Sequence, residues 1–224
     1  MIQLQPNWPA APDRIDLAQG EIHLWKVTLT SPRTQGACRA VLSAAELTRA
    51  ARYHFSEDAE RFIASRGAAR MILARYLACD PADLEFRTGP HGKPFIVHPF
   101  VDIRFNVSHS RDLAMIAVTR GREVGVDLEW VQPDIAFEPI ADYYFDPGEN
   151  WDLRSAPEEK RATRFFELWT RKEARLKAEG IGLAGAPASR ASWSVRQLEL
   201  AEGYSAAIAS EGADWKLAYW EWSL

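Results

Sequence analysis

The chain has 224 residues, of which 47% are hydrophobic and 26% are charged, and its formal net charge is −4. This composition is that of a folded globular protein and excludes a disordered chain, and the length allows one large domain or two small ones. The slightly acidic balance gives no general basic surface, which argues against nucleic acid as the main partner.

The cysteine content and the N-terminal sequence indicate the compartment. Cys38 and Cys79 are too few for a disulfide framework and lack metal-ligand spacing, which favours a reducing environment. Residues 1–20 lack the basic and then apolar pattern of a signal peptide, and no apolar run approaches the roughly eighteen residues that cross a membrane. We therefore expect a cytoplasmic protein that does not bind membranes.

The first half of the chain predicts a strand, two helices and then several strands. Residues 1–20 carry three prolines and predict an extended arm, and residues 21–30 alternate like a strand. A capping box at 43–46 begins one helix, and Ser56 is expected to cap a second helix that runs to about Cys79. Short strands are expected at residues 84–88, 95–97, 103–107, 113–119 and 123–129.

The second half repeats this order. Residues 133–152 are rich in proline, aromatic and acidic residues and predict a loop with helical pieces. A second capping box at 155–158 is expected to begin a long helix that ends at Gly180. Strands are expected near residues 192–200, 205–210 and 215–223. The pattern is α+β, with a candidate internal duplication near residue 113 but no letter-level repeat.

Two carboxylates stand out in the strand at 124–129. Because side chains alternate along a strand, Asp127 and Glu129 project from the same face, as a pair of hard oxygen ligands for a divalent cation such as Mg²⁺ would. Gly125 allows a ligand or another backbone to approach closely. A lone pair of this kind is more often the solvated acidic face of a strand.

A later segment adds a third carboxylate. At helical spacing Trp169, Glu173 and Lys177 lie on one face, while Lys172 points elsewhere. Taken alone, Glu173 and Lys177 are typical of a surface ion pair on a helix. Ser108 and His109 do not predict a nucleophilic dyad, because neighbours in an extended strand point to opposite faces.

Four motifs follow one another along the chain. They are Gly92-Lys93-Pro94, Phe105-Asn106-Val107-Ser108-His109-Ser110, Val124-Gly125-Val126-Asp127-Leu128-Glu129, and Trp169-x-x-Lys172-Glu173-Ala174-x-x-Lys177-x-x-Gly180-x-Gly182. In order and spacing they resemble those of the 4′-phosphopantetheinyl transferases of the surfactin-synthetase-activating (Sfp) type, over about residues 42–183. The resemblance implies two similar α+β halves related as a duplication, with the active site in the cleft between them. We place the first half, with its arm, at residues 1–112 and the second, with the carboxylates, at residues 113–224.

The resemblance also implies the reaction. The phosphopantetheine arm of coenzyme A would pass to a serine of an apo acyl or peptidyl carrier protein, releasing adenosine 3′,5′-bisphosphate. Asp127, Glu129 and Glu173 would supply one site for Mg²⁺ or Mn²⁺, and Glu173 is also the best candidate for deprotonating the serine. Whether Glu173 is ligand, base or both stays open. Lys177 would contact the pyrophosphate and steady the departing phosphate.

The remaining coenzyme A contacts follow from the same resemblance. His109 would bind the 3′-phosphate, Ser108 would help to hold the nucleotide, and Lys93 would lie beside the adenosine. Phosphate contacts are expected from Lys172, Arg49 and Arg52. Glu46 stands where some relatives have lysine, so one phosphate contact is absent or is supplied by an arginine elsewhere. The candidates for that contact are Arg33, Arg66 and Arg70.

Two other readings compete with the transferase. One is a nucleotide pyrophosphatase that uses the same three carboxylates and water in place of serine. The other is a binding module for coenzyme A or a carrier protein that has lost turnover. Asp127, Glu129 and Glu173 argue against the second, because a pure binder has no need to bring three carboxylates toward a pyrophosphate. The carrier protein and its pathway are not identified, and we expect a monomer.

Overall fold

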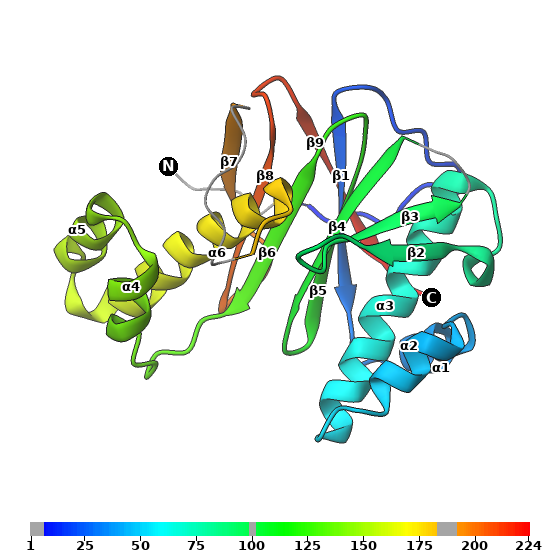
Figure 1. Ribbon diagram of the computed structural model, residues 1–224, viewed down its shortest axis with the longest axis horizontal. Helices are drawn as coiled ribbons and strands as arrows, with labels where there is room; N and C mark the ends of the chain where they lie inside the picture. Colours follow the sequence, from blue (N-terminus) through cyan, green and yellow to red (C-terminus); the bar gives the residue numbers. More distant parts are fainter. Residues whose placement is uncertain (1–6, 99–101, 183–191) are drawn as a thin grey trace.

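The computed structural model describes residues 7–98, 102–182 and 192–224 and forms two α+β lobes (Figure 1). The first lobe has a four-stranded sheet in the order β4-β5-β1-β9, in which β1 and β9 are parallel and the other neighbours antiparallel. The bounds are β1 Glu21–Thr28, β4 Ile103–Ser110, β5 Leu113–Arg120 and β9 Lys216–Trp222. Helices α1 Pro32–Ala40, α2 Ala44–Ala50 and α3 Ser56–Leu77, a 3₁₀ turn at Pro81–Asp83 and the hairpin of β2 Glu85–Thr88 and β3 Pro94–His98 complete this lobe.

The second lobe has a three-stranded antiparallel sheet in the order β6-β8-β7, on which the long helix α6 packs. Figure 1 shows two short helices, α4 and α5, at the end of the molecule away from the first lobe. The bounds are β6 Val124–Trp130, β7 Trp193–Leu198, β8 Tyr204–Glu211, α4 Glu138–Tyr144, α5 Pro147–Ser155, a 3₁₀ turn Glu158–Lys160 and α6 Arg161–Glu179. The predicted two-lobed α+β fold is confirmed.

The lobes share an apolar core. Ile22 of β1 and Met115 of β5 are buried in one cluster with Val126 of β6 and Ile208 of β8. The other face of the first sheet packs against α3 in a separate cluster that includes Trp25 and Ile72. The first sheet is therefore covered on both faces, by α3 on one and by the C-terminal lobe on the other.

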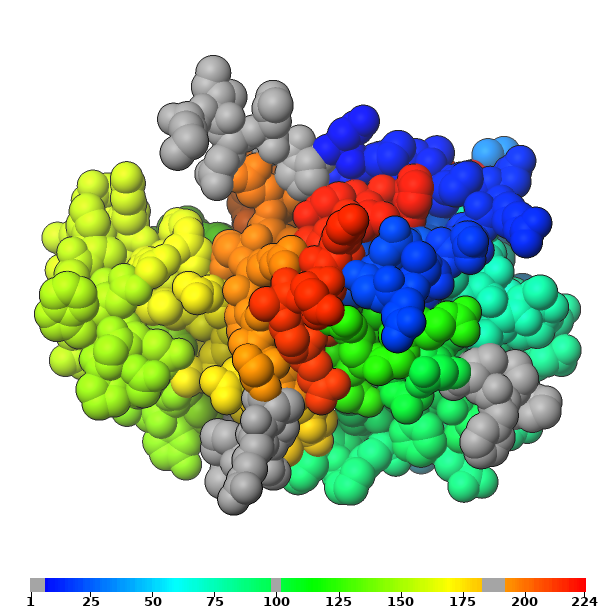
Figure 2. Space-filling view, turned by 90° about the horizontal axis from the view of Figure 1, so that it is seen from above, coloured from blue at the N-terminus to red at the C-terminus, as the bar shows by residue number. Residues whose placement is uncertain are grey.

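Both ends of the chain contribute to the first lobe. The C-terminal strand β9 pairs with β1, and the described part of the arm runs beside β9, where Glu221 N–H donates to Pro9 O at 2.8 Å. Figure 2 shows the arm in blue against the C-terminal segment in red. The predicted extended arm is confirmed from residue 7 onward. Strand β5, which follows residue 112, also belongs to this sheet, and the division between residues 112 and 113 stays a prediction.

The helix boundaries separate correct from wrong capping predictions. Ser43 and Glu46 form the predicted capping box, and α6 ends at Gly180 with a φ of +68°. Phe55, not Ser56, is the N-cap of α3 and makes no side-chain cap. Ser155 is the last residue of α5, so its predicted capping box is wrong. Helix α5 instead has a box from Asp146 and Glu149, which follows from the same rule applied at Asp146-Pro147. Among the described helices none is long and apolar enough to span a membrane.

A buried polar network ties β1 to α3. The Tyr76 hydroxyl accepts from Trp25 Nε1 at 2.8 Å and is hydrogen-bonded to His23 Nδ1 at 2.9 Å. The other ring nitrogen of His23, Nε2, lies 3.5 Å from Glu21 Oε2. Asp16 and the Trp220 ring also lie near the imidazole. Burial lowers the pKa of His23 below its ordinary 6.5, although Glu21 opposes the shift.

This network predicts acid sensitivity. Because the folded state binds a proton on His23 less readily than the unfolded chain, the free energy of unfolding falls as the pH drops below about 6.5. His23→Gln keeps an acceptor for Tyr76 but does not titrate, so the variant should lose less stability than the wild type. Urea unfolding of both proteins at about pH 7.5 and about pH 5.5 measures this difference. An equal loss in the two proteins would contradict the prediction.

Candidate active site

Strands β4 and β6 meet side by side where the lobes join, and polar side chains of β4 satisfy the backbone of β6. Strand β6 is the edge of its sheet, so alternate N–H groups have no strand partner. Val126 N–H donates to Asn106 Oδ1 at 2.9 Å, Leu128 N–H to Ser108 Oγ at 3.3 Å and Trp130 N–H to Ser110 Oγ at 3.1 Å. The Phe105–Ser110 motif therefore joins the lobes through every second side chain.

The two serines of this row also hold the carboxylates. Ser108 Oγ donates to Asp127 Oδ1 and Ser110 Oγ donates to Glu129 Oε2, both at 3.0 Å. Each hydroxyl thus accepts from the backbone of β6 and donates to a side chain of the same strand. Asp127 and Glu129 lie on one face of β6, as the alternation predicts.

Helix α6 reaches this face because Gly125 has no side chain. A Cβ added at Gly125 would lie 2.2 Å from Ala174 O and 2.2 Å from Ala178 N, which are backbone atoms of α6. The predicted close approach is therefore that of another backbone. Ala174 and Ala178 each follow a predicted site residue, Glu173 and Lys177, so the contact at Gly125 places both beside the carboxylates.

Lys177 is paired with the buried carboxylate. Its Nζ lies 2.6 Å from Asp127 Oδ1 and donates to Ser108 Oγ at 3.0 Å. Asp127 is only 2% exposed, so the ammonium offsets much of the cost of burying that charge. The helical stripe of Glu173 and Lys177 is thus part of the site and no solvated surface pair.

The carboxylates repel one another. Burial and then the charge of Asp127 raise the pKa of Glu129 to about 7, and the same two causes raise the pKa of Glu173. Asp127 Oδ2 and Glu173 Oε1 are buried and have no hydrogen-bond partner among the described residues. Carboxylate oxygens that lack hydrogen-bond partners, on residues whose charges interact, are suitable ligands for a hard divalent cation.

The ligand set is not preassembled as the side chains stand. Within the described ranges, no group of three His, Cys, Asp or Glu side chains has metal-binding spacing. Lys177 Nζ takes one oxygen of Asp127, and a flexible ammonium is displaced more easily than a backbone group. The unpartnered oxygens of Asp127 and Glu173 and the raised pKa values of Glu129 and Glu173 show that one lysine leaves the negative charge of these carboxylates only partly compensated.

A pocket of about 340 Å³ opens on the other face of β4. His109 and Val107 line it, together with Arg49 of α2. Ser108 points to the carboxylates and His109 to this pocket, which confirms that the two neighbours face opposite ways. The Arg49 guanidinium lies 5.2 Å from the centre of the Phe62 ring, at the wall of the same pocket.

Glu46 binds a second arginine of the pocket, Arg66. Arg66 Nε donates to Glu46 Oε1 at 2.5 Å and Arg70 Nε donates to Glu46 Oε2 at 2.8 Å. Burial alone would raise the pKa of Glu46, but the Ser43 N–H and the two arginines lower it. Arg66 lines the pocket, so of the three arginines considered from the sequence it is the one placed there. Its register with Glu46 depends on how α2 and α3 pack, which no local pattern reveals.

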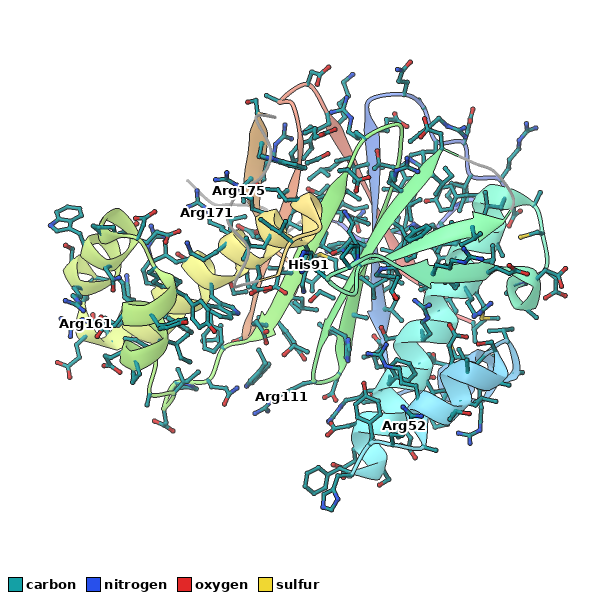
Figure 3. All side chains as sticks on the ribbon, viewed as in Figure 1. Arg52, His91, Arg111, Arg161, Arg171 and Arg175 are labelled. Carbon is teal, nitrogen blue, oxygen red and sulfur yellow. The ribbon has the colours of Figure 1, made fainter. Side chains whose placement is uncertain are left out.

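Three predicted contacts are not brought to this pocket. Arg52 follows the end of α2, is exposed, and does not line it (Figure 3). Lys172 Nζ lies 2.8 Å from Glu149 of α5. Lys93 Nζ donates to Glu123 Oε2 at 2.6 Å and to Ala178 O at 2.9 Å. The coenzyme A contacts expected of these residues stay predictions, and the structure gives both lysines other partners.

Comparison with known proteins agrees with the geometry. A family model described as the 4′-phosphopantetheinyl transferase superfamily matches residues 123–222, and one described as 4′-phosphopantetheinyl transferase, N-terminal, matches residues 29–121. The 4′-phosphopantetheinyl transferase HetI of Nostoc sp. is 37% identical over 98% of this chain and 100% of that protein. A putative 4′-phosphopantetheinyl transferase of Synechocystis sp. is 39% identical over 72% of this chain and 66% of that protein. The transferase Sfp of Bacillus subtilis is 33% identical over 59% of this chain and 58% of that protein.

Matches to both family models and a relative aligned over its whole length define the class as group-transferring enzymes. The chain belongs to the 4′-phosphopantetheinyl transferase family, as its motifs indicate.

The close contact at Gly125 predicts a strong effect of a single methyl group. Gly125→Ala should lower the free energy of unfolding by about 1–3 kcal/mol, because the added Cβ must push α6 away from β6. The displacement moves Glu173 and Lys177, so transferase turnover should fall roughly 100-fold in the fraction that folds. Urea unfolding and turnover of the soluble variant measure the two effects.

Gly36→Ala is the matched control. Gly36 lies in α1, and a Cβ there would meet no atom within 4 Å. This change should leave turnover unaltered and raise stability by about 0.5–1 kcal/mol, the usual gain in a helix. Wild-type turnover in Gly125→Ala would show that the contact does not position the site.

Proposed function

We propose that the protein transfers the 4′-phosphopantetheine arm of coenzyme A to a serine of an apo acyl or peptidyl carrier protein, in an Mg²⁺-dependent reaction that releases adenosine 3′,5′-bisphosphate. The observation that carries this proposal is the placement of two sites on opposite faces of β4. Buried carboxylates with unpartnered oxygens lie on one face, and a pocket with Arg49 and His109 lies on the other. A substrate with a pyrophosphate and a separate 3′-phosphate needs both.

Asp127, Glu129 and Glu173 would hold the cation. When bound, Mg²⁺ would neutralise the pyrophosphate oxygens and so lower the cost of attack by an oxygen nucleophile. Asp127 Oδ2 and Glu173 Oε1 have no donor to give up on binding it. Ser108 and Ser110 orient Asp127 and Glu129 through their hydroxyl groups, which fixes these ligands before any substrate arrives.

The pocket and Lys177 would hold the two ends of the donor. Arg49 and His109 supply cationic and hydrogen-bonding groups for the 3′-phosphate, and Arg66, held by Glu46, adds a second guanidinium. Lys177 would exchange Asp127 for the pyrophosphate and steady the charge on the departing phosphate. A lysine suits this exchange because its ammonium swings on a flexible stem.

Glu173 would remove the proton of the incoming serine. Burial and Asp127 raise its pKa, which makes the carboxylate a stronger base than an exposed glutamate. The serine oxygen forms a bond to the β-phosphorus as its proton passes to Glu173, and the bond from that phosphorus to the oxygen bridging to the α-phosphate breaks. Adenosine 3′,5′-bisphosphate leaves with the electron pair. Both faces of the site come from one chain, so we propose that the enzyme acts as a monomer. We also propose that it acts in the cytoplasm.

Intact mass of a carrier protein tests the reaction. An apo acyl or peptidyl carrier protein incubated with the enzyme, coenzyme A and Mg²⁺ should gain about 340 Da, the mass of the arm, and should gain nothing in chelator. Glu173→Gln should lower the rate about 10²–10⁴-fold, the usual contribution of a general base, while coenzyme A still binds.

Glu167→Gln is the matched control for Glu173→Gln. Glu167 lies on the same helix, and its carboxylate pairs with Arg164 at 2.6 Å, so its variant should turn over like the wild type. Hydrolysis of coenzyme A with no gain of mass on several carriers would replace the transferase with a pyrophosphatase. Coenzyme A binding with no reaction would leave only a binding module.

The cation site has a test that needs no turnover. Saturating Mg²⁺ should raise the thermal midpoint of the protein alone, because an ion at 100 times its Kd stabilises the folded state by about 2.7 kcal/mol. Asp127→Asn should abolish most of this rise. Asp134→Asn, a change at an exposed carboxylate outside the site, should keep it. An Mg²⁺ effect that survives Asp127→Asn would place the ion elsewhere.

A further inference from the structure

The β2–β3 hairpin forms one wall of the pocket but belongs to neither main sheet. Its two strands pair only with each other among the described residues. Thr88, Gly92 and Pro94 of the hairpin face the pocket that Arg49 and His109 line. At its base Phe86 packs on Phe105 of β4, with ring centres 5.5 Å apart. Because no described strand outside the hairpin pairs with it, side-chain contacts must set the position of its tip.

Lys93, at the tip, reaches across to the other lobe. Its side chain is 18% exposed, and its Nζ lies 2.6 Å from Glu123 Oε2 and 2.9 Å from Ala178 O. Glu123, in the turn before β6, also accepts from Arg104 Nε of β4 at 3.1 Å. The ammonium thus joins the hairpin to the β5–β6 turn and to the C-terminal end of α6.

Lys93 contacts α6 in the helical turn that also carries Lys177. Ala178 O is one of the last carbonyls of α6, which have no partner inside a helix, and a cation there is favoured by the helix dipole. Ala178 directly follows Lys177, whose ammonium is paired with Asp127. Figure 3 shows His91, also in the hairpin turn, at the same end of α6. A Cβ added at Gly182 would lie 3.7 Å from His91 Nδ1.

We propose that Lys93 is a positioning residue that clamps the β2–β3 hairpin onto the C-terminal end of α6. The clamp fixes the pocket wall relative to the helix that carries Glu173 and Lys177, so the donor and the reacting groups keep one geometry. The Lys93 side chain of the Gly92-Lys93-Pro94 motif then acts through the protein and not through a contact with the adenosine. This inference rests on the proposed function, which takes coenzyme A as the occupant of the pocket and Glu173 and Lys177 as reacting groups.

Variants at the two ends of the contact test the clamp. Lys93→Met keeps the apolar stem and removes the ammonium, and Glu123→Ala removes its partner without touching the pocket. Hydrogen exchange of the protein alone should become at least several-fold faster in both residues 89–93 and residues 176–180 of each variant. Lys93→Met should lower kcat and raise the Kd of coenzyme A, each about three- to tenfold, and Glu123→Ala should do the same to a smaller extent.

Non-additivity separates the clamp from a direct contact. If Lys93 acts through Glu123, the double variant should be no worse than Lys93→Met alone, and Arg104→Ala should control for the lost Arg104 pair by changing little. Lys160→Met, at an exposed lysine in the turn before α6, should match the wild type.

Three outcomes would overturn the proposal. A large rise in the coenzyme A Kd for Lys93→Met, with a wild-type Kd and kcat for Glu123→Ala, would assign Lys93 to a direct contact with coenzyme A. Faster exchange with unchanged kcat and Kd would reduce the pair to a structural ion pair. Unchanged exchange in both segments would remove the clamp. Exchange is measured without a carrier protein, so a failure of the transfer reaction would be recognised separately.

Discussion

The unpaired edge of β6 is the constraint on which the site depends. An edge strand buried against another lobe must find acceptors for its outward N–H groups, because each unsatisfied group costs about 1–3 kcal/mol. Asn106, Ser108 and Ser110 supply them, one side chain for every second residue of β6. A slip of one residue between β4 and β6 would turn these side chains away and leave the N–H groups bare. Closure of the two lobes therefore fixes the register of the strand that carries Asp127 and Glu129.

The same hydrogen bonds couple folding to chemistry. The hydroxyls that accept from the β6 backbone donate to Asp127 and Glu129, so the carboxylates are oriented by the contact that joins the lobes. The absence of a side chain at Gly125 then brings α6 close enough for Lys177 to reach Asp127. One ammonium against three carboxylates leaves an excess of negative charge in a buried place, and burial together with the charge of Asp127 raises the pKa of Glu129 to about 7. A metal ion that binds together with its phosphate ligands can compensate this excess of negative charge.

Sequence patterns correctly predicted those features of the site that depend only on the geometry of a single strand or helix. Alternation placed Asp127 and Glu129 on one face, helical spacing aligned Glu173 with Lys177, and the glycine at 125 marked a close approach. The partners of long side chains were beyond this reasoning. Lys93 and Lys172 end on carboxylates and a carbonyl contributed by other elements, and a flexible stem lets tertiary packing choose among them.

The capping box predicted at residues 155–158 failed for a related reason. Ser155 to Glu158 has the residue types of a capping box, but Asp146 begins a helix earlier and that helix extends through Ser155. When two capping boxes lie close together in the sequence, the helix that begins at one can include the residues of the other, and only one of them then acts as a cap. Glu46 shows the opposite case, in which the predicted cap forms and the same carboxylate also accepts from Arg66 and Arg70 of α3.

Strand β4 acts as a rigid partition between the two halves of the chemistry. Ser108 and His109 are consecutive, so the separation between the carboxylate face and the pocket face is set by backbone geometry and not by side-chain rotamers. In the proposed reaction, a donor that reaches both faces would be held at two points whose spacing the protein cannot easily change, which would favour a single reactive geometry. The opposite wall of the pocket is the β2–β3 hairpin, which pairs with neither main sheet among the described residues. Because the backbone sets the spacing at β4, the remaining freedom of the pocket lies in this hairpin, and the proposed Lys93 clamp would remove that freedom by fixing the hairpin to α6.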